Sequence, residues 1–310
     1  MYLVNGVGGQ LASRAAEEIL NHVPAKELVF CASRLDRIDP VNLMRWRDRG
    51  VTIREASYDN PEQLHKAYEG VERMLLVSTW MIGPTRQQQH ANAIDAAKRA
   101  GVEHIVYTSF VGAEIETDTP PVALDHRITE KNIIDSGLKW SFMRDTFYAD
   151  AVIQYFPPLA TLFGNLWRSN TGRKLVGYVA REDCSKVAAA LLAGKGEPNS
   201  IHVVTGPELL SDKDIFDLIC ARTGWTAEFV DLSDEDYYAF WDSHNVPRSV
   251  TGDFSKSPIP LCSDDLVTNG TSIRAGHHTL LTDTVEKLTG CKPLSARTVL
   301  EKYIDQLPKG

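Results

Sequence analysis

Basic residues are in the minority in this 310-residue chain, which carries 33 lysines and arginines against 41 acidic residues and a net charge of -8. An acidic chain without a basic cluster repels a phosphate backbone, so we expect no nucleic-acid partner. Long apolar runs are also missing, because no stretch approaches the roughly 18 to 20 residues that cross a bilayer. The first twenty residues mix polar and charged side chains, unlike a signal peptide. We therefore expect a cytoplasmic protein without a membrane partner.

Cysteine is scarce and follows no motif. The sequence has five cysteines, an odd number, and no two of them have the CxxC spacing of zinc sites and redox couples. We therefore expect buried, reduced thiols instead of disulfides, and no metal site. The five are Cys31, Cys184, Cys220, Cys262 and Cys291.

The first 145 residues repeat one pattern, in which a short apolar run rich in β-branched residues is followed by a turn and an amphipathic stretch with helical spacing. Strands are predicted at 2–5, 27–32, 50–58, 73–80, 104–110 and 138–145. Helices are predicted at about 10–22, from Pro61 onward, and at 85–101. This alternation predicts an α/β fold, a doubly wound parallel sheet of the Rossmann type, with ligands bound beyond the carboxyl ends of the strands.

The alternation breaks after Arg144. Residues 147–173 are rich in aromatic side chains, and residues 172–194 read as a strand and a helix capped by Asp183 that return to the sheet. Another strand is predicted at 200–206, followed by short helical stretches. We predict a dinucleotide-binding domain at 1–146, joined by 174–204, and a smaller, irregular α/β substrate-binding subdomain at 147–173 and 205–310.

The glycine cluster directly after the first strand suits a phosphate. Gly6 ends that strand, Gly9 follows three residues later, and Gly8 lies between them. Small residues at a turn from strand to helix let backbone amides and the helix N-terminus approach a pyrophosphate. We therefore assign Gly6 and Gly9 to a dinucleotide site, together with Gln10 and Leu11 at the start of the helix.

The end of the second strand predicts which dinucleotide binds. A site for NAD places a carboxylate here to hold the ribose hydroxyls. This chain has Ser33 and Arg34 instead, which suit the 2′-phosphate of NADPH through charge-assisted hydrogen bonds. Asp36 lies two residues further on and weakens that preference. We predict NADPH as the cofactor.

The glycine loop, Arg34 and the segments QQHANAIDAAKRAGVEHIVYTS and RDTFYAD together resemble the NmrA-like branch of the atypical short-chain dehydrogenases, in particular its quinone-reductase and triphenylmethane-reductase members. The resemblance covers most of the chain, including YVAREDCSKVAAALL and VTGPELLS. It implies that Ser78, Thr79 and Thr146 line the cofactor site and that Phe147 and Tyr148 border the nicotinamide. The chain departs from the family pattern at Gly8, Ala12 and Ser57.

The sequence has no tyrosine followed four residues later by lysine. Ordinary short-chain dehydrogenases use that pair to protonate a carbonyl, because the lysine lowers the pKa of the phenol. The corresponding helix has His126, four residues before Glu130 and on the same face. His126 is either a proton donor or substrate hydrogen-bond partner, or a helix residue that is paired with Glu130 or satisfied in packing. Ser109 is either a partner of the ribose or substrate, or a hydroxyl that caps its strand.

Without that pair, the chain suits acceptors that already contain an electron sink, because positioning alone can then promote hydride transfer. We expect an enzyme, an NADPH-dependent reductase of an activated, planar aromatic acceptor such as a quinone or an iminium ion. The predicted catalytic residues are His126, Ser109 and Tyr148. The predicted substrate contacts are Trp80, Met81, Phe147 and Tyr148, although Trp80 could equally be a core residue.

Two other functions stay open. The chain could be an NADP(H)-sensing regulator of the NmrA type, with a protein partner and no turnover, or a biosynthetic reductase or isomerase for one specialised metabolite. A homodimer is compatible with each. The aromatic residues between 147 and 167 favour a substrate pocket and therefore an enzyme that acts on a small molecule. His277 and His278 lack the spacing of metal ligands and are expected at the surface.

Overall fold

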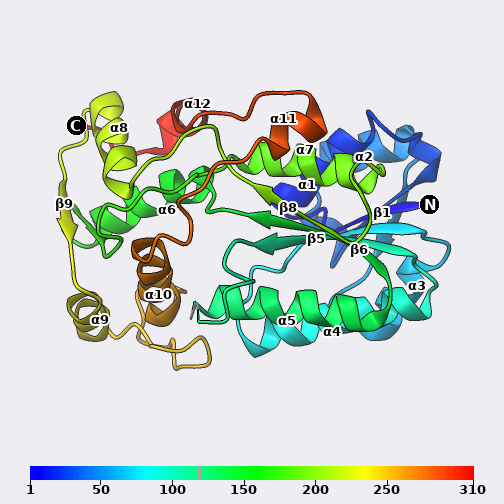
Figure 1. Cartoon of the computed structure of the whole chain (residues 1–310), viewed down its shortest axis with the longest axis horizontal. Helices are drawn as coiled ribbons and strands as arrows, with labels where there is room; N and C mark the ends of the chain where they lie inside the picture. The colour runs from blue at the N-terminus through cyan, green and yellow to red at the C-terminus, as the bar shows by residue number, and fades with distance from the viewer. Residues whose placement is uncertain (118–119) are drawn as a thin grey trace.

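A computed structural model describes residues 1–117 and 120–310 (Figure 1). Its centre is a parallel sheet of seven strands in the order β3-β2-β1-β4-β5-β6-β8. The strand order reverses beside β1, so a crevice for a ligand lies beyond the carboxyl ends of β1 and β4. The predicted α/β fold with a doubly wound parallel sheet is confirmed. The strands are β1 Tyr2–Asn5, β2 Leu28–Ala32, β3 Thr52–Glu55, β4 Arg73–Leu76, β5 His104–Phe110, β6 Lys139–Asp145 and β8 Ser200–Val204.

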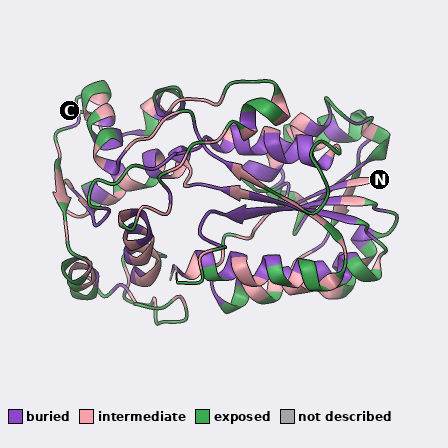
Figure 2. Ribbon diagram, viewed as in Figure 1, coloured by how far each residue is buried: buried purple, intermediate pink, exposed green. Residues whose placement is uncertain are grey.

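Alternate residues of the central strands are buried on opposite faces of the sheet. Val4 of β1 belongs to the apolar cluster under α1, α2, α7 and α11, whereas Leu3 belongs to the cluster under α3, α4 and α5 (Figure 1). Figure 2 shows these helices buried toward the sheet and exposed on the outside. Coverage of both faces explains the continuous apolar runs of the strands. The helices are α1 Gln10–Ile19, α2 Pro40–Asp48, α3 Pro61–Tyr68, α4 Pro84–Arg99, α5 Pro121–Ser136, α7 Arg181–Leu192 and α11 Thr284–Thr289.

A second group of elements lies beyond the carboxyl ends of the strands (Figure 1). It has apolar clusters of its own, and its two short strands, β7 and β9, pair in parallel. No helix in the described ranges is long and apolar enough to cross a membrane. The predicted division into two domains stays a prediction. The elements are α6 Ala149–Leu162, β7 Leu166–Ser169, α8 Asp212–Thr223, β9 Glu228–Asp231, α9 Asp234–Ser243, α10 Ser263–Arg274 and α12 Ala296–Tyr303.

Two local predictions for the segment that returns to the sheet are wrong. Instead of a strand before α7, the chain makes isolated bridges at Val176 and Val179, because β8 takes the place beside β6. Asp183 is not the cap of α7, which begins after Ala180 without a side-chain cap. The Asp183 carboxylate instead accepts a hydrogen bond from the backbone N–H of Leu294 at 2.7 Å.

Candidate functional site

The loop between β1 and α1 is held tightly against β2. The backbone N–H groups of Gly6 and Val7 donate to the carbonyl oxygen of Cys31 at 2.8 and 3.0 Å. Gly6 has a φ of +80°, a backbone conformation that residues with a side chain rarely adopt. Gly9 is the N-cap of α1 and provides no side-chain cap, so the first amides of the helix are available to an anion.

Gly8 lies against the chain that follows β2. A Cβ atom at this position would lie 3.0 Å from the Cβ of Arg37 and 3.3 Å from its carbonyl oxygen. Glycine therefore suits this point of close approach, where a side chain would press on the neighbouring backbone. Arg37 ends the short 3-10 helix Leu35–Arg37, so an arginine that sequence reasoning did not single out borders the glycine loop.

Arg34, the predicted contact of the 2′-phosphate, is exposed and pairs with Asp36. Its Nε atom donates to Asp36 Oδ1 at 3.0 Å, and a second nitrogen donates to Oδ2. The hydrogen bonds raise the pKa of Arg34 and lower that of Asp36. Glu55 lies nearby, where its carboxylate accepts the backbone N–H of Leu35 at 3.0 Å. A phosphate would compete with Asp36 for the guanidinium.

The loop that follows β4 is held by three side chains from two neighbouring elements, β5 and α4. The N–H of Ser78 donates to Thr108 Oγ1 at 2.8 Å, and the N–H of Thr79 donates to His90 Nε2 at 3.1 Å. Arg86 Nε donates to the carbonyl oxygen of Thr79 at 3.0 Å. Thr79 Oγ1 is buried and has no hydrogen-bond partner among the described residues. A buried polar atom without a partner fits a site that a ligand completes.

The remaining predicted cofactor contacts connect α1 to α7. The amide oxygen of Gln10 accepts a hydrogen bond from Arg181, and the carbonyl oxygen of Leu11 accepts the hydroxyl of Ser185 at 3.1 Å. These bonds fix the start of α1 beside the start of α7. Together with the glycine loop and the Thr79 hydroxyl, they fit a dinucleotide with its pyrophosphate at the N-terminus of α1.

Asp125 and Arg86 form a buried ion pair that the sequence did not reveal. Arg86 NH1 lies 3.6 Å from Asp125 Oδ2. The same carboxylate accepts the N–H of Gly83 at 2.6 Å and the side-chain amide of Gln87 at 2.7 Å. Gly83 is the N-cap of α4, so Asp125 on α5 binds the backbone N–H at the start of that helix. Burial lowers the pKa of Arg86 and raises that of Asp125.

His126 is buried on α5, with its Nδ1 atom 2.7 Å from the hydroxyl of Tyr107. Burial lowers the pKa of His126 well below its ordinary value, and the nearby Arg86 and His90 lower it further. The imidazole is therefore neutral at physiological pH and already has a partner. The packed interpretation of His126 matches these contacts, although Glu130 is not its partner. A catalytic role for His126 stays a prediction.

Ser109 is the residue before the end of β5 and belongs to a second buried polar group, with Glu130 and Arg144. Its hydroxyl donates to Glu130 Oε1 at 2.6 Å, and Arg144 donates to both oxygens of Glu130 at 2.9 and 2.7 Å. The hydroxyl groups of Thr146 and Tyr148, which follow β6, also donate hydrogen bonds within the protein. The hydroxyl of Thr146 donates to the carbonyl oxygen of Gly177 at 2.6 Å.

The hydroxyl of Tyr148 donates to Asp145 Oδ2 at 2.7 Å. Burial raises the pKa of Tyr148 well above its ordinary value, and the Asp145 carboxylate raises it further. Burial also raises the pKa of Asp145 to about 8. The phenol is therefore a weak acid in this setting. Its roles as catalytic residue and substrate contact stay predictions.

Three aromatic rings meet where β5 and β6 end. The ring centroids of Phe110 and Phe147 lie 5.1 Å apart, and His278 lies 5.3 Å from the first and 4.7 Å from the second. The surface location expected for His278 is wrong, because the loop before α11 carries this residue into the interior at 0% exposure. Burial lowers its pKa to about 3, and its Nδ1 atom has no hydrogen-bond partner in the described ranges.

Trp80 projects from the loop after β4 and is 80% exposed. This exposure removes the alternative in which Trp80 belongs to the core. Met81 beside it is half-buried. Both lie at the same edge of the sheet as the aromatic rings that follow β5 and β6, because the carboxyl ends of parallel strands share one edge. Their contact with a substrate stays a prediction.

Most of the predicted residues lie along the carboxyl edge of the sheet, in or beside the loops after β1, β2, β4 and β6, whereas Ser109 lies within β5 and His126 on α5. Sequence reasoning missed Arg86, Asp125 and His278. One signal was available for Arg86, since its spacing of four residues from His90 puts both on one face of α4. The partners of Asp125 and His278 come from distant parts of the chain, so no local pattern reveals them.

Residues 6–194 match the model of a family described as NAD(P)H-binding. Quinone oxidoreductase 2 of Escherichia coli is 28% identical over 261 residues, which are 84% of this chain and 87% of that protein. The NmrA-like family domain-containing oxidoreductase flvB of Aspergillus flavus is 28% identical over 245 residues, which are 76% of each protein. The resemblance to the NmrA-like branch is thereby confirmed.

Solved structures agree with these relatives. The NADPH-dependent quinone oxidoreductase of Escherichia coli in complex with NADPH has a TM-score of 0.81 at 25% identity and covers 97% of this chain and 99% of its own. The triphenylmethane reductase of Citrobacter in complex with NADP(H) shares the fold, with a TM-score of 0.80 at 24% identity and the same coverage of 97% and 99%. The matched segment contains the glycine loop and the elements from α1 to α7. This chain belongs to the NAD(P)H-binding family and is an NAD(P)H-dependent oxidoreductase.

Proposed function

We propose that this chain is an NADPH-dependent reductase that transfers hydride to an activated, planar aromatic acceptor such as a quinone or an iminium ion. One observation carries the proposal. The polar side chains predicted to be catalytic have their hydrogen-bonding groups engaged inside the protein, while aromatic rings occupy the same edge of the sheet. The engaged pairs are His126 with Tyr107, Ser109 with Glu130, and Tyr148 with Asp145.

This arrangement suits an acceptor that needs no strong acid. A plain ketone develops alkoxide charge as hydride arrives, so its reduction requires a donor already aimed at the oxygen. A quinone, an iminium ion or a delocalised carbocation takes the electron pair into its own π system. Proximity and orientation are then the main contribution of the protein. Bound NADPH would supply the hydride.

Each part of the site has a role in this proposal. Gly6, Gly9 and the N-terminus of α1 bind the pyrophosphate, and Arg34 binds the 2′-phosphate. Phe147 and the exposed Trp80 present ring faces on which a flat acceptor can stack.

One relative and its solved structure support this choice of cofactor and acceptor. The relative is named a quinone oxidoreductase, and its solved counterpart holds NADPH. Ser33 and Arg34 stand where a carboxylate would favour NADH, which agrees with NADPH. The acceptor is a small molecule, and a homodimer or a protein partner stays a prediction.

The test is turnover of NADPH, followed by its absorbance, with a quinone, a cyclic iminium ion and a cationic triphenylmethane dye. A plain aliphatic ketone is the matched control. We expect oxidation with at least one of the three activated acceptors and none with the ketone. Tight NADPH binding without turnover of any acceptor would contradict the proposal and favour the regulator.

His126→Gln separates the two interpretations of this residue. A glutamine side chain can still bond to the Tyr107 hydroxyl but cannot deliver a proton as an imidazolium does. We expect kcat with the quinone, and its pH profile, to stay close to those of the parent protein. Loss of a general acid would instead lower kcat by about 10²- to 10⁴-fold and change the profile.

A further inference from the structure

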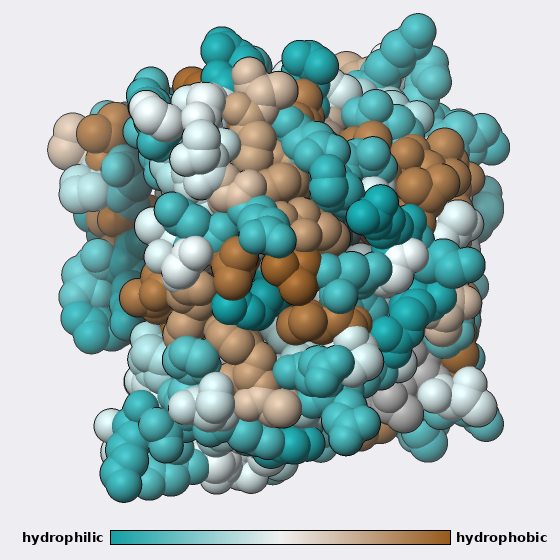
Figure 3. Space-filling model, turned by 90° about the vertical axis from the view of Figure 1, so that its left-hand side faces the viewer, coloured by the Kyte–Doolittle hydropathy of each residue, from teal (hydrophilic) through white to brown (hydrophobic). Residues whose placement is uncertain are grey.

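A hollow opens at the end of the molecule farthest from the first strands, between the end of α6, β7 and α9. Its volume is about 580 Å³, within the range of small-molecule sites. Apolar side chains gather near the middle of this face, mixed with hydrophilic ones (Figure 3). Phe163 and Phe240 line the hollow, and Arg168, His244 and Lys256 stand beside them. The hollow therefore joins aromatic surface to the positive charges of Arg168 and Lys256.

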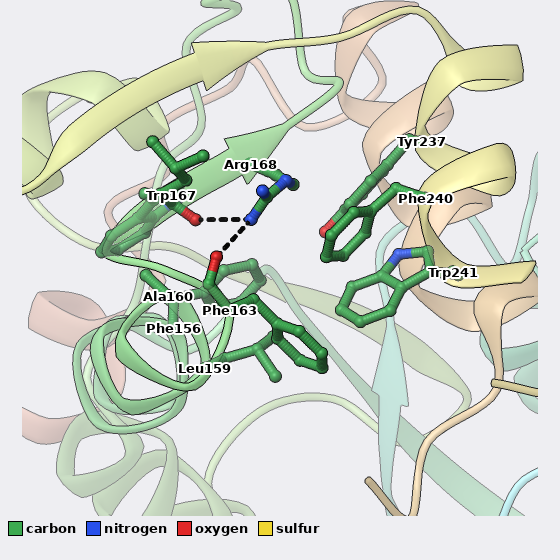
Figure 4. Close-up of a pocket in the computed structure, with 10 residues that line it drawn as sticks. Phe156, Leu159, Ala160, Phe163, Trp167, Arg168, Tyr237, Phe240 and Trp241 are labelled. Atoms are coloured by element: carbon green, nitrogen blue, oxygen red, sulfur yellow. Dashed lines mark hydrogen bonds between the residues drawn. The ribbon is translucent and has the colours of Figure 1, made fainter. Parts of the chain in front are cut away.

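The guanidinium of Arg168 is fixed in place. Its central carbon lies 4.0 Å from the centroid of the Phe240 ring. One terminal nitrogen, NH1, donates to the carbonyl oxygens of Phe163 at 3.0 Å and Leu166 at 3.3 Å (Figure 4). Stacking and these two bonds hold the planar group in one orientation. Its remaining N–H groups have no partner among the residues that the structure describes, so they can bind an anion.

The hollow has positive charge without a carboxylate to match it. No aspartate or glutamate is among its lining residues in the described ranges. Arg248 shows the contrast, because it also stacks on a ring, 4.2 Å from the Tyr238 centroid, but its Nε atom donates to Asp242 at 3.1 Å. Among the described residues, Arg168 and Lys256 have no acidic side chain within ion-pair distance.

The hollow lies apart from the carboxyl edge of the sheet, where the proposed function places the nicotinamide. α6 begins at Ala149, directly after Tyr148, and ends at Leu162 beside the hollow. Fourteen helical residues span about 21 Å, at 1.5 Å per residue. An inner void next to the hollow, also lined by Phe163 and Arg168, has room for about one water, so a ring would lie in the outer part.

We propose that this hollow, formed by Phe163, Arg168, Phe240, His244 and Lys256, binds a small planar aromatic anion, such as an aromatic carboxylate, separately from the cofactor and acceptor. The ring of the ligand packs on Phe163 and Phe240. Its carboxylate takes the free N–H groups of Arg168 and the charge of Lys256. Among the described lining residues, Arg168 contributes the one guanidinium, so the binding of the anion depends on it.

The experiment is calorimetric titration of the full chain with naphthoate, with and without saturating NADPH, and with the neutral naphthylmethanol as the matched ligand. We expect naphthoate to bind at least about tenfold more tightly than the alcohol, with an affinity that NADPH leaves unchanged. Equal affinity for the two ligands would overturn the proposal. Displacement of naphthoate by NADPH or by the quinone would also overturn it, because the ligand would then occupy the catalytic cleft.

Variants locate the binding site. Arg168→Gln and, at an exposed position, Lys256→Glu should each weaken naphthoate binding, the former by about tenfold. Arg248→Gln, at the paired arginine, should leave the affinity unchanged. Unaltered binding in both Arg168→Gln and Lys256→Glu would overturn the proposal, as would sedimentation showing that a second copy of the chain covers this face.

Discussion

Arg34 and Arg86 are both arginines of the cofactor region, but their surroundings differ. Arg34 is exposed and its guanidinium forms an ion pair with Asp36, so a phosphate that binds here can replace Asp36 as its partner. Arg86 is buried, holds the carbonyl oxygen of Thr79 and faces Asp125. The first can therefore recognise a ligand, and the second can support the loop after β4.

Arg34→Glu should shift the preference from NADPH toward NADH. The substituted carboxylate would repel the 2′-phosphate and could bond to ribose hydroxyls, so the ratio of kcat/KM for the two cofactors should fall by roughly tenfold or more. Steady-state kinetics with both cofactors measures this ratio. Arg47→Glu, the same change of charge at an exposed position on α2, is the control. An unchanged ratio would place the 2′-phosphate elsewhere.

His90 binds the loop that follows β4, and the bond depends on the protonation state of its imidazole. Thr129 Oγ1 donates to the carbonyl oxygen of Asp125 at 2.8 Å, so it accepts from His90 Nδ1, and His90 Nε2 is left to accept the N–H of Thr79. Only the neutral imidazole can make both bonds. Burial, and then Arg86, lower the pKa of His90 to about 3.

The free energy of unfolding should therefore depend on pH through His90. The folded pKa lies below the unfolded value of about 6.5, so the unfolded chain binds the proton more strongly. The contribution is complete above about pH 6.5 and is lost as the pH falls toward about 3. Urea unfolding should show the advantage over His90→Gln shrinking by about 2 kcal/mol between pH 7 and pH 5. His22→Gln, at an exposed position, should show no such change.

At the scale of elements, the start of α4 depends on α5. Gly83 has no side chain with which to cap α4, and Asp125 reaches across from α5 to accept its N–H. Arg86 and His90 on α4 then hold Thr79. The two helices therefore fix the loop that carries Ser78, Thr79 and Trp80.

Asp125→Asn should destabilise the protein and raise the KM for NADPH. The change removes the carboxylate paired with Arg86 and leaves Asp265 as its other acidic neighbour, so the cost should approach the roughly 3 to 5 kcal/mol of a broken buried pair. Thermal unfolding and steady-state kinetics measure the two effects. The control is Asp135→Asn on the same helix, where the pair with Lys131 is exposed and should contribute little. Equal losses for both variants would mean that the buried pair has no special role.

At the scale of the whole molecule, the chain passes repeatedly between the sheet and the elements beyond it. After α6 and β7 it returns as α7 and β8, and after α10 it returns again as α11. Val285 of α11 packs in the same cluster as Val4 of β1. Because late segments complete the core of the sheet, we expect the two parts to unfold together.

NADPH should stabilise both parts in one transition. At a concentration one hundred times its Kd, a ligand that binds the folded state adds about 2.7 kcal/mol. Circular dichroism and tryptophan fluorescence should give coincident unfolding curves that shift together with NADPH. A separate, NADPH-insensitive transition would show that the elements beyond the sheet fold independently.

Local patterns in the sequence were sufficient to predict the parallel sheet and the glycine loop after β1. Apolar runs mark strands buried on both faces, and Gly6 marks a positive φ that the turn requires. Two predictions from these patterns were wrong: Asp183 does not cap α7, and the segment before α7 is not a strand. Whether an extended segment joins a sheet depends on which strand already occupies the edge, and β8 occupies it here.

The sequence by itself determined the parallel α/β sheet, the position of its glycine loop and the residue types offered to the cofactor, because each depends on neighbours within a few residues. The tertiary structure alone decided the burial of His278 between Phe110 and Phe147, the pairing of Asp125 with Arg86, and the partners of His126 and Tyr148. These contacts join segments far apart in the chain, and burial then sets the pKa of each group.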